Sequence, residues 1–323
     1  MEQGSKLFLR AASFVTITML YVVLVLGFSA AVEPGNSAYA LTYSADRVIE
    51  KSFDVRPGGL LNLQTRTGSV EIEGWDRDEV RLKIEISGRS KDIDEIEFKI
   101  ESSVDGVDIQ AEVPRTRGFF SDWGSGIRLK YSILVPYEYD TKIRTAGGSI
   151  SLREIDGVLD ANTSGGGLNA EQLSGNIRLT TSGGGVKAER LNGDIVLKTS
   201  GGSITVDGAY GKLEARTSGG PIRMSGIDAE VQARTSGGGI TFSSIGENKG
   251  VNLRTSGGSI TVHLPESIQG NLSARTSGGR VSTDFPVTVQ GTLSSSSIEG
   301  IINNGGPDIV LHTSGGSIRI NKK

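Results

Sequence analysis

Apolar residues recur at fixed positions on either side of a repeated four-residue phrase, Thr-Ser-Gly-Gly. The phrase begins at Thr163, Thr181, Thr199, Thr217, Thr235, Thr255, Thr276 and Thr313, with a near copy at Thr145. With each Thr as slot 0, apolar residues fill slots −4 and −2 before it and slots +5, +7 and +10 after it. Alternate slots share one face of a strand, so each repeat predicts two short β-strands with a buried apolar side.

The residues between these strands predict two corners in every repeat. Ser-Gly-Gly makes the first, because glycine adopts backbone angles that other residues resist. The second falls near slot +10 and often contains glycine, as at 191–193. The predicted inner residues of slot +10 are Ile155, Leu173, Leu191, Ala209, Ile227 and Ile245.

The step between phrases is 18 residues five times running, from Thr145 to Thr235. One such unit cannot bury its apolar side alone, so the units must stack into parallel sheets with rungs about 4.8 Å apart. The sequence therefore predicts an all-β fold, a single-stranded parallel β-helix (solenoid) with about 18 residues per rung. The general preference of parallel crossovers predicts a right-handed coil.

The step lengthens toward the C-terminus, to 20, 21 and then 37 residues before Thr313. The last gap fits two rungs, one of which has lost its phrase, with 293–298 as its remnant. The closing residues Lys322 and Lys323 suit an end that must not stack on another molecule.

The N-terminal part departs from the repeat. Residues 41–140 predict a β-rich cap with one degenerate rung, and residues 141–323 the solenoid proper. The degenerate rung is formed by Leu61, Leu63, Thr65, Val70, Ile72 and Trp75, which match the slot pattern. The loop 115–126 is expected to expose Phe119, Phe120 and Trp123.

Residues 1–40 predict a targeting segment. Lys6 and Arg10 precede an uncharged run, 11–32, and Ala38-Tyr-Ala40 is a small-x-small cleavage pattern. This is typical of a signal peptide, but 22 uncharged residues are also enough for an uncleaved anchor. Either way we expect the rest in the periplasm, the outer membrane or at the cell surface, or anchored in the inner membrane and facing outward. Membrane contact is then expected only through 11–32.

Composition narrows the chemistry. Without cysteine the chain has no disulfide, thiolate metal site or cysteine nucleophile. The net charge of −3 gives no reason to expect nucleic acid. His263 and His312 stand 49 residues apart, and no Ser–His–Asp set can be assembled from them. We expect no catalytic residue, no metal site and no cofactor.

One outward row is basic. Slot −1 is occupied in five successive rungs by Lys198, Arg216, Arg234, Arg254 and Arg275. Stacked like charges repel unless something offsets them, and only Glu214, at slot −3, lies on that face to help. The row would suit an anionic polysaccharide, lipid headgroups or an acidic edge of another envelope protein. Alternatively, it only keeps the sheet soluble and unpaired.

A second outward row is acidic. Glu171, Glu189 and Asp207 occupy slot +8 in three successive rungs. Such carboxylates could act in acid–base chemistry on a sugar or hold Ca²⁺. Alternatively, they form a solvated row that Lys187 and Arg190 balance.

The Thr-Ser-Gly-Gly-x-Ile phrases, together with segments 53–59, 68–75 and 314–320, resemble a bacterial family of candidate adhesins with β-strand repeats and unknown function. The resemblance covers nearly all of 47–320. It implies a single-stranded β-helix exported to the envelope, and it supplies no catalytic residues.

These features together predict a non-enzymatic, exported cell-envelope protein, a rigid β-solenoid that presents a surface for adhesion or ligand binding. Its ligands would be anionic glycans or lipids held by the basic row. Two alternatives stay open: a carbohydrate-active β-helix enzyme (lyase or hydrolase) that uses the acidic row, and a self-assembling envelope scaffold.

Overall fold

The computed structural model describes residues 45–88, 93–112, 127–289 and 294–323. The predicted signal or anchor segment and the aromatic loop 115–126 lie outside these residues. No described helix has the length and apolar character needed to cross a membrane. The strands are β1 (Ala45–Asp54), β2 (Leu60–Thr65), β3 (Ser69–Trp75), β4 (Glu79–Gly88), β5 (Glu97–Ser103), β6 (Gly106–Glu112), β7 (Arg128–Pro136), β8 (Asp140–Thr145), β9 (Ile150–Thr163), β10 (Leu168–Thr181), β11 (Val186–Lys198), β12 (Ile204–Arg216), β13 (Ile222–Arg234), β14 (Ile240–Ser244), β15 (Val251–Thr255), β16 (Ile260–Leu264), β17 (Gly270–Thr276), β18 (Val281–Thr283), β19 (Val287–Thr288), β20 (Ser297–Ile302), β21 (Asp308–Thr313) and β22 (Ile318–Lys322).

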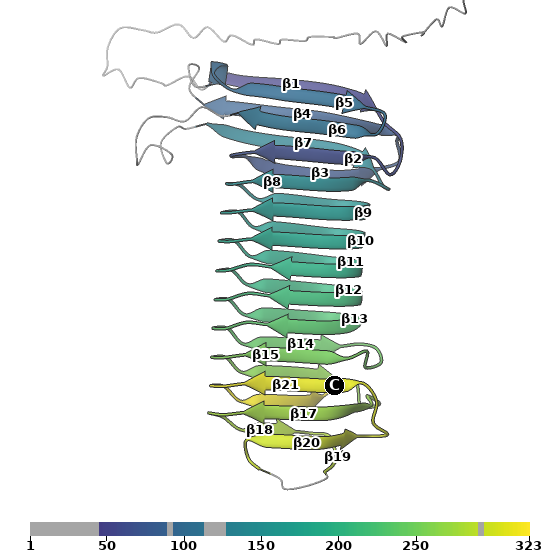
Figure 1. The fold of residues 1–323 in the computed structure, drawn as a ribbon, viewed down its shortest axis with the longest axis vertical. Helices are drawn as coiled ribbons and strands as arrows, with labels where there is room; N and C mark the ends of the chain where they lie inside the picture. The colour runs from purple at the N-terminus through teal and green to yellow at the C-terminus, as the bar shows by residue number, and fades with distance from the viewer. Residues whose placement is uncertain (1–44, 89–92, 113–126, 290–293) are drawn as a thin grey trace, which may run out of the picture. The chain divides into compact units, whose positions relative to one another are not determined.

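The repeats stack in parallel, rung on rung, as the slots predict (Figure 1). Ile177 pairs with Ile195 and Ile195 with Leu213, so equal slots lie above one another. We call the ladder of segments that lead to each repeat Thr the Thr sheet, and the ladder that follows each Ser-Gly-Gly corner the Ile sheet. In β9 to β13 a single strand runs from the Ile sheet through the second corner into the Thr sheet. The predicted all-β parallel β-helix is confirmed.

The core is a continuous set of aliphatic columns between the two sheets. Every apolar residue of slots −4, −2 and +5 is at most 6% exposed, including Ile204, Ile222 and Ile240. One prediction is wrong: Ile245 is 49% exposed. The β13–β14 register shifts after Met224, so that Ser244 pairs with Ile227 and takes the buried place instead.

The repeat Thr is buried, and its hydroxyl joins neighbouring rungs. Thr181 Oγ1 donates to the carbonyl of Gly166 in the preceding rung at 2.7 Å and accepts from the N–H of Gly184 at 3.3 Å. The same pair of bonds recurs at Thr199, Thr217, Thr235, Thr255, Thr313 and Thr276. Buried backbone groups at a sharp corner need such partners, which explains why each phrase begins with Thr.

The second glycine of the phrase is required by the stacking. A Cβ on Gly184 would lie 2.1 Å from the carbonyl oxygen of Gly166. Only glycine lets the corners of successive rungs approach so closely.

Antiparallel strands close the N-terminal end of the stack. β2 lies between β6 and β8, and β3 lies between β7 and β9, so residues 60–75 form a parallel rung. Beyond this rung, β4 pairs antiparallel with both β7 and β1, and β5 pairs antiparallel with β6. The parallel ladder therefore ends in antiparallel pairs.

The C-terminal end differs from the prediction. β21 inserts between β15 and β17, and β22 inserts between β16 and β18, so the last rung in sequence is not the last in the stack (Figure 1). We call β21 and β22 the inserted rung. The expected extra rung at 293–298 is also wrong in its described part, because β20 pairs antiparallel with β17 and forms a cap.

The terminal lysines therefore do not lie at an open end of the stack. Lys322 pairs with Glu266 at 3.0 Å, and Lys323 Nζ donates to the carbonyl of Ser244 at 3.0 Å.

The position of the inserted rung has a physical reason. The rung that contains Thr276 has Thr283 at slot +7 and only three residues in β18, so it is a weak rung. The inserted rung is aliphatic at the same slots and gains a neighbour on each side.

Candidate functional site

The outer face of the Thr sheet is basic. Strand alternation turns slots −3 and −1 outward there, because slots −4, −2 and 0 are buried. From β8 to β17 the cations in these two slots are Lys142, Arg144, Arg178, Lys198, Arg216, Arg234, Arg254 and Arg275. The acids are Asp160 and Glu214. We call this surface the basic face.

The outer face of the Ile sheet is balanced instead. From β9 to β22, slots +6 and +8 carry the cations Arg153, Lys187, Arg223 and Arg319. The acids in those slots are Glu171, Glu189, Asp207 and Asp284. The two sheets therefore differ in charge, although the same repeat builds both.

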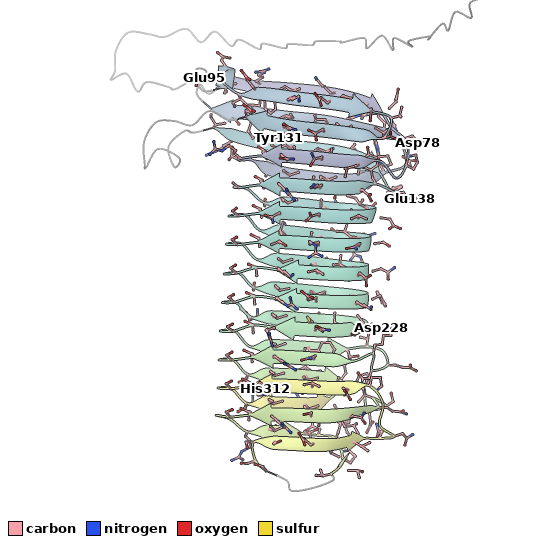
Figure 2. All side chains as sticks on the ribbon, viewed as in Figure 1. Asp78, Glu95, Tyr131, Glu138, Asp228 and His312 are labelled. Atoms are coloured by element: carbon pink, nitrogen blue, oxygen red, sulfur yellow. The ribbon has the colours of Figure 1, made fainter. Side chains whose placement is uncertain are left out.

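The predicted run of five successive cations is interrupted. Lys198, Arg216, Arg234 and Arg254 do pair in register on adjacent rungs. His312 then follows Arg254, and Arg275 lies beyond it, because the inserted rung separates them. Figure 2 shows His312 on this face of the stack. The row is thus four cations, one histidine and a fifth cation.

Acids neutralise the two ends of this row but not its middle. Glu214 pairs with Lys198 at 3.4 Å and with Arg216 at 3.0 Å, and Glu299 of the cap pairs with Arg275. Arg254 Nε donates to the neutral Asn252 at 3.0 Å, and the Arg254 side chain forms no ion pair with the described residues. The Arg234 side chain forms no hydrogen bond or ion pair within the described part of the chain.

Two neighbouring guanidinium groups, those of Arg234 and Arg254, thus face solvent without an acid. Like charges at the rung spacing of about 4.8 Å repel by about 1 kcal/mol in water. An anion bridging both groups would remove this repulsion and accept charge-assisted hydrogen bonds.

The structure also places the three acids of the acidic row next to one another, but each of them contacts a cation or a hydroxyl group. Glu171, Glu189 and Asp207 stand in register on adjacent rungs. Glu171 lies between Arg153 at 3.3 Å and Arg190 at 2.6 Å, as ion pairs. Asp207 Oδ1 accepts from Ser225 Oγ at 3.0 Å.

The contacts of Glu189 show whether the acidic row could supply a general acid. Lys187 lies 2.7 Å from Glu189. The hydrogen bond between them lowers the pKa of Glu189 and raises the pKa of Lys187. A general acid needs a raised pKa, so this shift has the wrong direction for that role. Among the described residues, no group of three His, Asp or Glu side chains is placed to hold a metal ion. The acidic row has the contacts of a salt-bridged surface.

A third feature was not singled out from the sequence. The second corner forms an open groove of about 520 Å³ along the edge of the stack. It is lined by Gly175, Asn176, Gly193, Asp194, Gly211, Lys212, Glu230 and Lys249. Figure 2 shows Asp228 and Glu138 on the same edge. The signal was present as glycine at slot +12 followed by a polar residue at slot +13, repeated at the 18-residue step.

Comparisons with known proteins give the following matches. No curated protein matches the chain. A candidate cell adhesion protein of Clostridium sporogenes is 15% identical and superposes with a TM-score of 0.22, over 86% of this chain and 100% of the other. A candidate adhesin of Parabacteroides merdae is 9% identical with a TM-score of 0.40, over 86% and 96% of the two chains. A candidate lipid-binding protein of Parabacteroides distasonis is 14% identical with a TM-score of 0.31, over 85% and 96%.

The family model called Toastrack DUF4097 matches residues 60–321. This range runs from the first parallel rung, β2 and β3, to the inserted rung, and of the antiparallel strands at the two ends it leaves out only β1. The chain belongs to the Toastrack DUF4097 family.

Proposed function

We propose that this chain is an exported, non-enzymatic envelope protein whose basic face binds a partner with repeated phosphate or carboxylate groups. An acidic polysaccharide or the headgroups of an anionic lipid would supply this chemistry. One observation carries the proposal: the Thr sheet displays an excess of cations that its own acids leave uncompensated at Arg234 and Arg254. Export is supported by the charged and then apolar sequence of residues 6–32.

The rigidity of the stack matters for this role. Arg216, Arg234 and Arg254 stand on adjacent rungs whose backbones are fixed by the parallel ladder. An array held in register loses little entropy on binding, so several weak contacts can add up along one extended partner. Each cation near an anionic surface contributes about 1 kcal/mol.

The test is to replace Arg216, Arg234, Arg254 and Arg275 with Ser. Arg216 and Arg275 already have acidic partners, so most of the loss should come from Arg234 and Arg254. Two cations at about 1 kcal/mol each predict at least about 30-fold weaker binding. Binding is measured on vesicles that contain phosphatidylglycerol and, separately, on polygalacturonate, because the two probes distinguish the two sources of charge.

The matched control replaces Arg153, Lys187, Arg223 and Arg319, the outward cations of the Ile sheet, with Ser. It changes the net charge by the same amount but leaves the basic face intact, so binding should weaken far less. Equal losses in both variants would mean that only net charge matters. Unchanged binding in the first variant, with an unchanged unfolding midpoint, would reduce the basic face to a solubility device.

A further inference from the structure

The groove at the second corner has a floor without side chains. Gly175, Gly193 and Gly211 pair in register on three adjacent rungs. A Cβ on Gly193 would lie 2.1 Å from the carbonyl oxygen of Gly175, so the stacking keeps this row bare. The residues that follow the glycines, at slot +13, line the depression.

The wall on one side is polar and unpartnered. It consists of Asn176, Asp194, Lys212 and Glu230, which follow one another on adjacent rungs at slot +13. All four are exposed, and within the described part of the chain their side chains form no hydrogen bond or ion pair. Asp194 and Lys212 are register neighbours but do not pair, unlike the register neighbours Arg153 and Glu171 on the Ile sheet. Donors and acceptors therefore alternate along the wall.

The residues at slot +11, which precede the glycine floor in the chain, add further groups beside it. Ser174, Asn192 and Tyr210 pair in register there. Tyr210 precedes Gly211 of the floor and is 45% exposed, one of the few large apolar side chains on the surface of the stack. An aromatic ring beside convergent polar groups is typical of small-ligand sites.

The charge of the groove argues against an anionic ligand. Among the described lining residues, Asp194 and Glu230 oppose one cation without an ion pair, Lys212, because Lys249 pairs with Asp228 at 2.7 Å. A ligand with a strong charge of either sign would meet a like charge within one rung. An uncharged chain rich in hydroxyl groups would find a donor or acceptor on every rung and a ring for its C–H face.

We propose that this groove binds a neutral, linear oligosaccharide. The lining residues from Gly175 to Glu230 span roughly 14 Å at about 4.8 Å per rung. One sugar residue of an extended glycan has about the length of one rung, so the groove takes three to four sugars. The site is separate from the basic face and goes beyond the function proposed above.

The experiment titrates the purified chain with neutral linear oligosaccharides of two to six units, from β-1,4-glucan, α-1,4-glucan and β-1,4-linked N-acetylglucosamine, by calorimetry. For the series that binds, affinity should rise with length up to about four units and then level off. Tyr210→Ala and Asp194→Ala should each weaken binding about tenfold, the loss of one good contact. The matched controls are Tyr137→Ala, with 47% exposure but away from the rungs that form the groove, and Asp207→Ala on the Ile sheet, neither of which should change the affinity.

Failure of this proposal is distinguishable from failure of the proposed function. The four Arg→Ser replacements should leave oligosaccharide binding unchanged, and Tyr210→Ala should leave vesicle and polygalacturonate binding unchanged. The proposal is overturned if no series binds, or if groove variants and controls bind equally well.

Discussion

The substitution Leu311→Ala tests the position of the inserted rung. Leu311 is 1% exposed and lies between Leu253 and Ala274 in the column of slot −2. Removing a fully buried Leu side chain from a packed column costs about 2–5 kcal/mol of unfolding free energy. If the rungs stacked in sequence order, Leu311 would be outermost and would lack one of these neighbours.

The chain offers a close control in Leu197→Ala. Leu197 occupies the same slot in β11, is 0% exposed and lies between Leu179 and Ala215, again one Leu and one Ala. Because both leucines have the same pair of neighbours, the two substitutions should cost the same within about 0.5 kcal/mol.

The assay must allow for the one-dimensional coupling of a solenoid, whose ends can open separately. We would measure urea unfolding together with native-state hydrogen exchange of the amides in β21 and β11. Equal costs and equal protection of the two strands are expected. A cost for Leu311→Ala of less than half that for Leu197→Ala, with fast exchange in β21, would refute the insertion.

Two further predictions concern the corners and the buried tyrosines. Gly202→Ala should lower the unfolding free energy by about 1–3 kcal/mol, because the new Cβ would lie 2.1 Å from the Gly184 carbonyl oxygen. The control Gly201→Ala, whose Cβ would have 3.5 Å to the nearest atom, should lower it by less than about 1 kcal/mol. Equal urea midpoints for the two variants would contradict this prediction. Burial raises the pKa of both Tyr131 and Tyr139 to about 12. Stability should therefore be complete below pH 10 and fall between pH 10 and 12, by about 1.4 kcal/mol per pH unit and tyrosine. The buried hydroxyl of Tyr139 forms no hydrogen bond with the described residues. Tyr139→Phe should therefore reduce the fall in stability with pH without lowering stability at pH 7, as measured by unfolding curves from pH 7 to 12. An unchanged dependence on pH would show that Tyr139 is not the group responsible.

The slot pattern predicted the rungs because stacking repeats a single set of contacts. The columns through Ile204 and Leu197 followed from strand alternation, and the corner at Gly184 followed from the phrase itself. The prediction for Ile245 was wrong for a local reason: the register shift after Met224 has no counterpart in the other described rungs.

The order of rungs at the C-terminal end could not be predicted from the pattern. The rungs that contain Thr255, Thr276 and Thr313 present equivalent slots, so each could stack on either of the others. The possible stacking orders have nearly equivalent interfaces, and the observed order depends on the short strand β18 and on the cap strand β20.

The candidate site was predictable only in part. The outward direction of Arg234 and Arg254 followed from alternation. Their lack of an acidic partner did not, because ion pairs such as Arg275–Glu299 join residues from different rungs and from the cap. The groove was missed because its wall mixes an amide, two carboxylates and an amine, which resembles an ordinary solvated row until the bare glycine floor beside it is seen.

The most direct measurement of the proposed function follows the arginine side-chain N–H signals by NMR while polygalacturonate oligomers or anionic lipid bicelles are added. The signals of Arg234 and Arg254 should shift first and saturate together, while those of Arg223 and Arg319 on the Ile sheet stay in place. Equal shifts on both sheets, or none on the Thr sheet under conditions where the ligand binds, would contradict the assignment of anion binding to the basic face.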